Sequence, residues 1–593
     1  MRRSADSVAC GGLPARLTRL PMPEDPAEAT APAEPAAASA RTPDQWATRV
    51  GVILAVVGSA VGLGNFLRFP GLAAKYEGGA FMIPYFIALL VLGIPLAWAE
   101  WALGRRGGRK GFHSTPGIYW ALTDSMAARG RRGMAYLGTL GTIVPVIIFM
   151  YYVLIEAWCL SYAWFFLTGT MAELGEQAAA SGAAGEVDAS PFVGLFTGWA
   201  GMDANGAALA QPGLLLAVAL CFALNFGLIA RGVSKGIERF CLFAMPALIA
   251  CAFLVLLRVL TLPGVTDGLG AMWNPPADAA GWRETLGNPT MWLEATGQIF
   301  FSLSIGFGLI IVYASYVKRN EDIALSGLSA AAGNELCEVC LGGLITIPAA
   351  ALFLSATALT AAAASTFNLG FMTLPLVFDA MPGGRFFGFL FFFLLFLAAA
   401  TSSLSMLQGA IALFEEGLGL TRAKAVGLLA AVAAAGTLLV LVFSKDAKAL
   451  DTLDTWVGTL FIYVLATTQT ILFGWVLGPE KGMAELDRGA AMRVPRLIGF
   501  VVRWVCPVYL GVLFVAFVYA QIDSWWNDGE GMIYNLIHDG VVQLSVGFMG
   551  LVIFGTLMAI HLAVPRWQRL SEEQQAEEDA STWTAGSHPG GAS

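Results

Sequence analysis

The sequence predicts an all-α membrane protein with about twelve transmembrane helices. Hydrophobic residues make up 57% of its 593 residues and charged residues only 13%, whereas soluble proteins carry roughly 25% charged residues. Apolar runs of about 20 residues or more, long enough to cross a bilayer, recur from residue 50 to residue 564. One polytopic membrane domain therefore explains the length better than several soluble domains.

The chain divides into three predicted parts. Residues 1–43 are polar, rich in Ala and Pro, and lack the apolar core of a signal peptide, so we expect a disordered N-terminal tail. Residues 44–565 form the transmembrane domain, and residues 566–593 form a polar, acidic C-terminal tail. The expected spans lie near residues 50–73, 80–104, 134–168, 212–230, 238–261, 290–316, 323–362, 384–417, 424–443, 450–477, 496–521 and 541–564.

The basic residues between the spans predict the orientation of the chain in the membrane. They gather in the connections between spans 2 and 3, 6 and 7, 8 and 9, and 10 and 11: Arg105, Arg106, Arg109, Lys110, Arg131, Arg132, Lys318, Arg319, Arg422, Arg488 and Arg493. The long connection over residues 169–211, on the other side, holds no Lys or Arg. Because cytoplasmic loops carry the excess of Lys and Arg, we expect a multi-pass protein of the cell (inner) membrane with both termini cytoplasmic.

Composition and motifs argue against nucleic-acid binding and against enzyme chemistry. The net charge is −8 and the basic residues form no continuous stripe, so no nucleic-acid partner is expected. A G-x-S-x-G match at 232–236 lies in a basic connection with no strand before it, and a C-x-x-C match at 337–340 lies inside a span. There is no nucleotide-binding motif and there are only four His residues, so the predicted protein is not an enzyme and draws its energy from an ion gradient.

Two spans contain Gly- and Ser-rich stretches at membrane depth. Span 1 carries GSAVGLGN at 58–65, and span 6 carries SLSIGFG at 302–308. Glycines can simply allow close helix packing. Two such stretches at the start of two five-span halves instead favour broken helices, which in a membrane must line a cavity and which mark the binding site of inverted-repeat transporters.

Several longer motifs are recognisable along the chain: GSAVGLGNFLRFP (58–70), GGAFMIPY (78–85), YYVLIEAW (151–158), RGVSKGIERF (231–240), GQIFFSLSIGFG (297–308), NLGFMTLP (368–375) and TSSLSMLQ (401–408). Together they closely resemble the neurotransmitter:sodium symporter family, and in particular its bacterial amino-acid members. The likeness covers roughly residues 44–565. It implies a leucine-transporter-type fold, an inverted five-helix repeat with broken helices 1 and 6.

The resemblance implies two sodium ions and no organic cofactor. The first sodium site would use Ala60, Asn65, Ser302 and Asn334, together with the carboxylate of the substrate. The second would use Gly58, Val61, Ala398, Thr401 and Ser402. Carbonyl, amide and hydroxyl oxygens suit such a hard cation. Without the resemblance, the Thr-Ser-Ser triplet at 401–403 is better explained by hydrogen bonding between helices.

A substrate pocket between the broken helices is implied in the same way. It would be formed by Ala60, Leu63, Gly64, Ile148, Tyr152, Phe301, Ser302, Ser304, Phe307, Ser402 and Met406. Amine transporters of the family carry Asp where this chain has Gly62, so the substrate should bring its own carboxylate. The apolar side chains in the set predict a neutral, hydrophobic amino acid.

The resemblance also assigns residues to an outer and an inner gate, and one residue that would take the place of a bound chloride ion. Arg68 and Asp454 could meet across the outer entrance. The inner-gate Arg of the family is replaced by Pro43, so Arg41 is the expected partner of Glu416.

Glu338 lies one helical turn after Asn334, where chloride-dependent relatives carry Ser, and it predicts chloride independence. For Glu100 and Glu156 we expect hydrogen-bonded structural roles near the broken helices.

The resulting hypothesis is a sodium-coupled symporter that imports neutral, hydrophobic L-amino acids by alternating access. Its partners are the amino acid and the lipid bilayer, and a homodimer is compatible with the sequence. One alternative is an amino-acid sensor or binding protein on a transporter fold without flux. A membrane enzyme is the third alternative.

Overall fold

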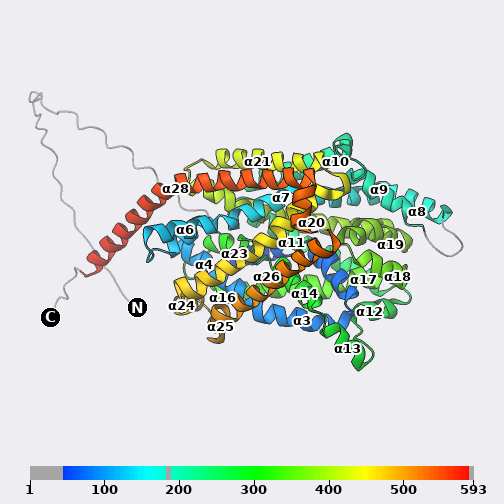
Figure 1. Cartoon of the computed structure of the whole chain (residues 1–593), viewed down its shortest axis with the longest axis horizontal. Coiled ribbons are helices and arrows are strands. Elements are labelled where there is room, and N and C mark those ends of the chain that lie inside the picture. Colours follow the sequence, from blue (N-terminus) through cyan, green and yellow to red (C-terminus); the bar gives the residue numbers. More distant parts are fainter. Residues whose placement is uncertain (1–44, 182–187, 530, 587–593) are drawn as a thin grey trace, which may run out of the picture. The chain divides into compact units, whose positions relative to one another are not determined.

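The computed structural model describes residues 45–181, 188–529 and 531–586, and every regular element within these ranges is a helix. Figure 1 shows the arrangement of these helices. The all-α prediction is therefore confirmed for the described chain.

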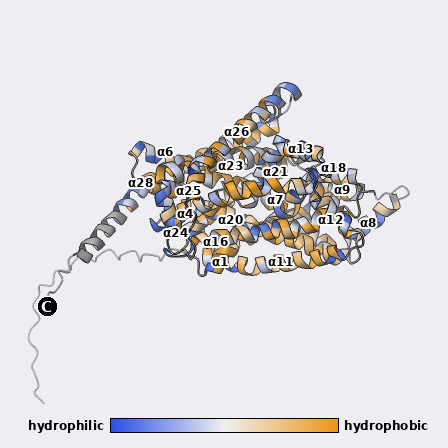
Figure 2. Cartoon of the chain, turned by 90° about the horizontal axis from the view of Figure 1, so that it is seen from below, coloured by the Kyte–Doolittle hydropathy of each residue, from blue (hydrophilic) through white to orange (hydrophobic). Residues whose placement is uncertain are grey.

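Ten apolar helical segments in the described ranges are long enough to cross a membrane. In chain order they contain α4 (Ile94–Arg109), α7 (Leu140–Thr168), α10 (Pro212–Ile229), α11 (Arg239–Leu260), α16 (Ile323–Glu335) with α17 (Gly343–Ala350), α20 (Gly384–Glu416), α21 (Arg422–Val442), α23 (Ile462–Ile471), α26 (Cys506–Asp523) and α28 (Gly540–Gly586). Figure 2 shows hydrophobic residues along these helices and hydrophilic residues at α6 (Ala128–Gly138) and α24 (Pro479–Asp487).

The first span is broken where the sequence predicts. Helix α1 (Arg49–Ala60) ends in Val61, whose backbone is extended (φ −72°, ψ 111°). The chain resumes as η1 (Gly64–Arg68) and α2 (Phe69–Lys75), bent by 53° from α1. If the two halves form one span, they are the eleventh candidate crossing.

The sixth span is also broken. Helix α14 (Pro289–Ser302) and helix α15 (Leu309–Ser315) are separated by six non-helical residues. The break contains three residues with positive φ: Ser304 at 54°, Gly306 at 76° and Gly308 at 80°. Glycine adopts this backbone region without steric cost. Counted as one broken span, α14 and α15 would add a twelfth crossing to the ten or eleven candidates of the described chain.

The broken spans lie against the central helices of the bundle. Helix α20 packs along α7 and α11, and α1 packs against α11, α16 and α20. Helix α15 packs against α4. The same central helices are labelled in Figure 1. Both breaks are therefore surrounded by protein rather than by lipid.

One predicted boundary was wrong, and one helix continues beyond its predicted span. The span expected at 323–362 ends at Ala350 and is followed by the separate helix α18 (Ala356–Ala363). The last span, expected to end near residue 564, continues as helix α28 to Gly586. The added segment is rich in Glu, Gln, Ala and Arg, which favour helix without being apolar, so hydropathy alone did not reveal it.

Candidate functional site

Side chains satisfy the backbone groups that the two helix breaks set free. The N–H of Gly306 donates to Glu100 Oε1 at 2.8 Å, and the N–H of Gly62 donates to Asn65 Oδ1 at 2.8 Å. The hydroxyl of Ser304 donates to the carbonyl of Ser59 at 3.0 Å and so links the two breaks. These bonds stabilise unwound backbone that would otherwise cost several kcal/mol per buried polar group.

One cluster of polar side chains lies beside both breaks. Asn65 Nδ2 donates to Asn334 Oδ1 at 2.9 Å and to Glu338 Oε2 at 3.0 Å. Asn334 Nδ2 donates to the hydroxyl of Ser302, which in turn donates to Glu338. Each of these four residues is at most 2% exposed. The cluster brings together Asn65, Ser302 and Asn334 of the first predicted sodium set, and Ala60 borders the same cavity as Asn65 and Ser302.

A second cluster joins α20 to the end of α1. The Ser402 hydroxyl lies 3.3 Å from each of the carbonyl oxygens of Gly58 and Val61. The Thr401 hydroxyl donates to the carbonyl of Ala398 at 3.0 Å. All five residues of the second predicted sodium set are thus within reach of one another. Uncharged oxygen donors in this number suit sodium, and no group of three or more His, Cys, Asp and Glu residues in the described ranges suggests a transition-metal site.

A cavity of about 310 Å³ adjoins both clusters and reaches Arg68 and Asp454. All eleven residues predicted to bind substrate line it: Ala60, Leu63, Gly64, Ile148, Tyr152, Phe301, Ser302, Ser304, Phe307, Ser402 and Met406. Its volume falls within the range of about 300 to 1000 Å³ that is typical of small-molecule sites.

The cavity offers both hydroxyl groups and aromatic surface. A Cβ added to Gly62 would lie 3.1 Å from the Tyr152 hydroxyl and 3.5 Å from the Ser402 hydroxyl. The rings of Phe301 and Phe307 pack edge to face, with centroids 5.6 Å apart. This arrangement can hold a small molecule that has a polar head and an apolar tail.

The predicted outer gate is not closed in this structure. Arg68 and Asp454 both line the cavity, but none of the ion pairs of the described chain joins them. The Arg68 guanidinium lies 4.6 Å from the ring centroid of Phe301, and Asp454 accepts a hydrogen bond of 2.6 Å from Tyr151. Both charges therefore have other partners in this conformation, and their role as an outer gate stays a prediction.

At the inner gate, Arg41 lies outside the described residues, and its expected partner has other contacts. Glu416 accepts hydrogen bonds from the N–H groups of His113 at 2.7 Å and Ser114 at 3.2 Å, and from the Ser114 hydroxyl. The carboxylate thus caps the start of helix α5 (Thr115–Leu122).

A different carboxylate holds the inner end of α1. Glu238 accepts hydrogen bonds from the N–H of Ala47 at 2.8 Å, the N–H of Thr48 at 2.9 Å and the Thr48 hydroxyl at 2.7 Å. It is 1% exposed and packs directly on Gly51, where a Cβ would collide with its carboxylate. Glu238 lies in the RGVSKGIERF motif, yet its contact with α1 could not be read from the sequence because the two are far apart in the chain.

Glu100 and Glu156 are both hydrogen-bonded, as expected, but of these two it is Glu100 whose bond goes to a helix break. Glu100 binds the sixth-span break, as described above. Glu156 accepts hydrogen bonds from Asn225 Nδ2 at 2.9 Å and from the Ser403 hydroxyl at 2.7 Å, which links α7 to α10 and α20.

Two groups of residues at the site were not identified from the sequence. Gln298 donates to Glu338 at 2.7 Å, and Tyr85 donates to Glu335 at 2.8 Å, one residue from Asn334. Gln298 could have been found, since a polar residue four positions before Ser302 shares its helix face. Thr366 and Phe367 also line the cavity, from the connection between spans 7 and 8, where no local pattern marks them.

Comparison with known proteins agrees with this geometry. The family described as the sodium:neurotransmitter symporter family matches residues 43–177 and 201–556. An uncharacterised sodium-dependent transporter of Methanocaldococcus jannaschii is 27% identical over 494 residues, which are 82% of this chain and 92% of the relative. The mouse sodium-dependent neutral amino acid transporter B(0)AT3 is 34% identical over 287 residues, which are 46% of this chain and 42% of the relative. Among solved structures, MhsT in complex with L-phenylalanine has a TM-score of 0.65 and 27% identity, covering 80% of this chain and 99% of that one.

Proposed function

Because the chain belongs to the sodium:neurotransmitter symporter family, we propose that it imports neutral L-amino acids together with sodium by alternating access. The observation that carries the proposal is the cavity that two oxygen-rich clusters border at the two helix breaks. Gradient-driven uptake of radiolabelled amino acids into proteoliposomes tests it. Substrate binding without uptake would instead support the sensor alternative.

The sodium ions would bind where the two clusters gather oxygen atoms. We assign the first ion to Ala60, Asn65, Ser302 and Asn334, and the second to Gly58, Val61, Ala398, Thr401 and Ser402. Bound sodium supplies positive charge at the helix breaks. Ser302 borders both the first cluster and the cavity. A substrate carboxylate in the cavity can therefore bind next to the first ion, which couples the two ligands.

The substrate is an α-amino acid rather than an amine, because the protein places no carboxylate at Gly62. The N–H groups of Leu63 and Gly64, together with the Tyr152 hydroxyl, can bind the carboxylate of the substrate. Ile148, Phe301, Phe307 and Met406 form the apolar wall, which favours a hydrophobic side chain. The similarity to B(0)AT3, a neutral amino acid transporter, and to MhsT, whose structure was solved with L-phenylalanine, supports this substrate class.

We propose that transport is independent of chloride, because Glu338 takes the place of the anion. Its carboxyl group accepts hydrogen bonds from Asn65, Gln298 and Ser302, and in its ionised form it would supply a negative charge beside the first sodium site. We expect the Glu338→Ser variant to lose uptake in chloride-free buffer and to regain it in chloride. Uptake is measured with gluconate and with chloride as the anion.

The control for this prediction is Glu156→Ser, which removes another buried carboxylate, one that accepts hydrogen bonds from Asn225 and Ser403 rather than from the first sodium cluster. Chloride should not rescue that variant. If Glu338→Ser loses activity and chloride restores none of it, the assignment of Glu338 as an anion substitute is wrong.

We propose that Glu238 holds the inner gate closed through the start of α1. Glu238→Gln replaces a charged acceptor by a neutral one and should raise the inward-open population roughly tenfold, as loss of one charge-assisted hydrogen bond predicts. The readout is labelling of an Ala55→Cys variant by a membrane-impermeant maleimide from the cytoplasmic side, with Cys10 and Cys340 replaced by Ser. Ala55 is a buried residue of α1.

Gly51→Ala perturbs the same contact from the other side, because its methyl group would displace the Glu238 carboxylate. It should raise labelling as Glu238→Gln does, and the double variant should add little. Additive effects of the two substitutions, or unchanged labelling, would show that this contact does not control the gate.

A further inference from the structure

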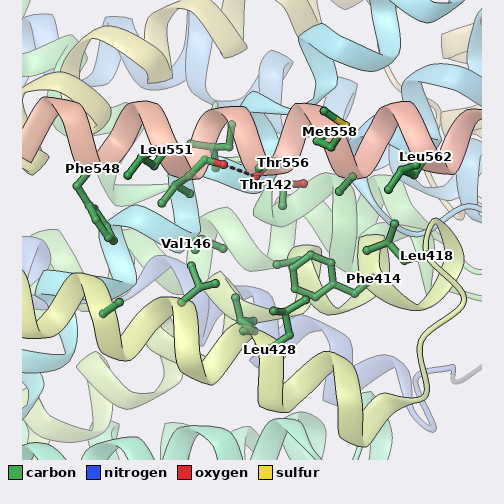
Figure 3. A pocket seen from close by; sticks show the side chains of 18 residues that line it. Thr142, Val146, Phe414, Leu418, Leu428, Phe548, Leu551, Thr556, Met558 and Leu562 are labelled. Atoms are coloured by element: carbon green, nitrogen blue, oxygen red, sulfur yellow. Dashed lines mark hydrogen bonds between the residues drawn. The ribbon is translucent and has the colours of Figure 1, made fainter.

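A second cavity, of about 460 Å³, lies between α7, α20, α21 and α28 and shares no lining residue with the substrate cavity. Figure 3 shows it from close by, with Phe414, Leu428 and Leu551 among the side chains that project into it. Eighteen residues line it; none is charged, and Thr142 and Thr556 alone carry hydroxyl groups. Nothing in the proposed transport cycle uses this cavity.

The rim of this lateral cavity faces out of the helix bundle. Leu428 is 42% exposed, Leu551 70%, Met558 46% and Leu562 62%. All four helices around it belong to predicted membrane spans, so its mouth opens toward lipid. A water molecule in this cavity would find few hydrogen-bond partners. The Thr556 hydroxyl already donates to the carbonyl of Val552, and few other polar groups line the cavity. The fitting occupant is a hydrocarbon chain.

On two of the helices that form the lateral cavity, α28 and α21, a basic residue lies one helical turn beyond the lining residues. Arg566 follows Leu562 by one turn of α28, and Lys424 precedes Leu428 by one turn of α21. Both side chains are exposed, and neither takes part in the ion pairs of the described chain. The Arg566 guanidinium lies against Gly419, next to the lining residue Leu418. The apolar lateral cavity therefore ends at two exposed cationic side chains that can bind an anion.

We propose that the lateral cavity binds one acyl chain of an anionic phospholipid, whose phosphate lies on Arg566 and Lys424. In the orientation given by the basic connections, these cations face the cytoplasmic leaflet, and anionic lipids attract basic residues near that surface. A second copy of the chain is less suitable, since a two-fold contact would bring the same cations together at the same membrane level. The charge pattern thus favours an anionic lipid.

The test measures lipids retained by the purified full-length protein. Delipidated protein is incubated with phosphatidylglycerol or with phosphatidylcholine of the same acyl chains, and bound lipid is counted by native mass spectrometry. We expect one tightly bound phosphatidylglycerol per chain. The double variant Arg566→Gln/Lys424→Gln should bind it roughly 30-fold more weakly, whereas Arg493→Gln, at an exposed arginine outside the cavity, should not change binding.

A matched pair of glycines on α28 tests the cavity itself. A Cβ added to Gly555, which lines the cavity, or to Gly550, which does not, would meet no other atom within 4 Å, so both positions tolerate a side chain. Gly555→Leu should fill the cavity and abolish tight lipid binding, while Gly550→Leu should keep it. Equal retention of the two lipids by the unmodified protein, or a Gly555→Leu variant that dissociates a dimer without changing bound lipid, would overturn the proposal.

Discussion

Replacing Asn65 by alanine is expected to weaken sodium binding and substrate binding together. Asn65 supplies an amide oxygen at the first break and a hydrogen bond to Asn334, the second amide of the same cluster. Loss of one oxygen next to an ion costs about 1.5 to 3 kcal/mol, or roughly 10- to 100-fold in affinity. Because the substrate carboxylate would share the shell of the ion, thermodynamic linkage makes the two losses reciprocal.

The measurement is the equilibrium binding of a radiolabelled amino acid, titrated with sodium at constant ionic strength. Asn225→Ala is the matched control, since Asn225 is another buried amide that donates to a buried carboxylate, Glu156. It should lower thermal stability without shifting the sodium dependence. If the affinity of the unmodified protein for substrate is the same in sodium and in sodium-free potassium buffer, the coupling argument fails.

A carboxylate at Gly62 is expected to abolish amino-acid uptake. The Cβ of the Gly62→Asp variant would point at the hydroxyls of Tyr152 and Ser402, which is where the substrate carboxylate is proposed to lie. Two carboxylates juxtaposed there would repel each other by several kcal/mol, so uptake should fall about 100-fold or more. The variant should favour the decarboxylated amine of the same amino acid, whose cation can pair with Asp.

Gly62→Asn separates charge from size in this experiment. The amide is close to isosteric with the carboxylate, so any loss that the two variants share is due to crowding against Tyr152. We expect Gly62→Asn to keep more amino-acid uptake than Gly62→Asp and to gain no preference for the amine. Equal behaviour of the two variants in competition assays would contradict the proposed position of the substrate carboxylate.

The breaks in spans 1 and 6 could be predicted from the sequence because their cause is local. Glycines and serines at 58–65 and 302–308 interrupt otherwise apolar runs, and a membrane tolerates unwound backbone only at a protected cavity. The convergence of Asn65 with Asn334, and of Ser402 with Gly58, needed the family resemblance. These partners are hundreds of residues apart, and no spacing rule connects them.

The gates were less predictable, because they depend on conformation and on small shifts of charged side chains. Arg68 and Asp454 line the same cavity, yet Arg68 lies over the Phe301 ring and Asp454 accepts a hydrogen bond from Tyr151. Glu416 ends helix α20, but its contacts go to His113 and Ser114, and Glu238 binds the start of α1 instead. The sequence around an acidic residue such as Glu238 does not reveal which helix end that residue will cap.

The end of the last span shows a different limit. Hydropathy marks where a helix leaves the hydrocarbon region, which is how the boundary near residue 564 was predicted. It does not mark where the helix itself ends, and α28 continues through the polar residues after Pro565 to Gly586. For the same reason, the lateral cavity between α21 and α28 could not be foreseen, since it depends on how tightly apolar faces pack rather than on how apolar they are.

The most direct test of sodium-coupled amino-acid symport is the concentration ratio that the protein can build. Proteoliposomes with equal amino-acid concentrations inside and outside are given an inward sodium gradient, and the internal amino acid is followed with time. The account predicts that the internal concentration rises above the external one, and that a sodium ionophore or replacement of sodium by potassium abolishes the rise. An internal concentration that never exceeds the external one, while sodium-dependent binding persists, would contradict it and favour a sensor.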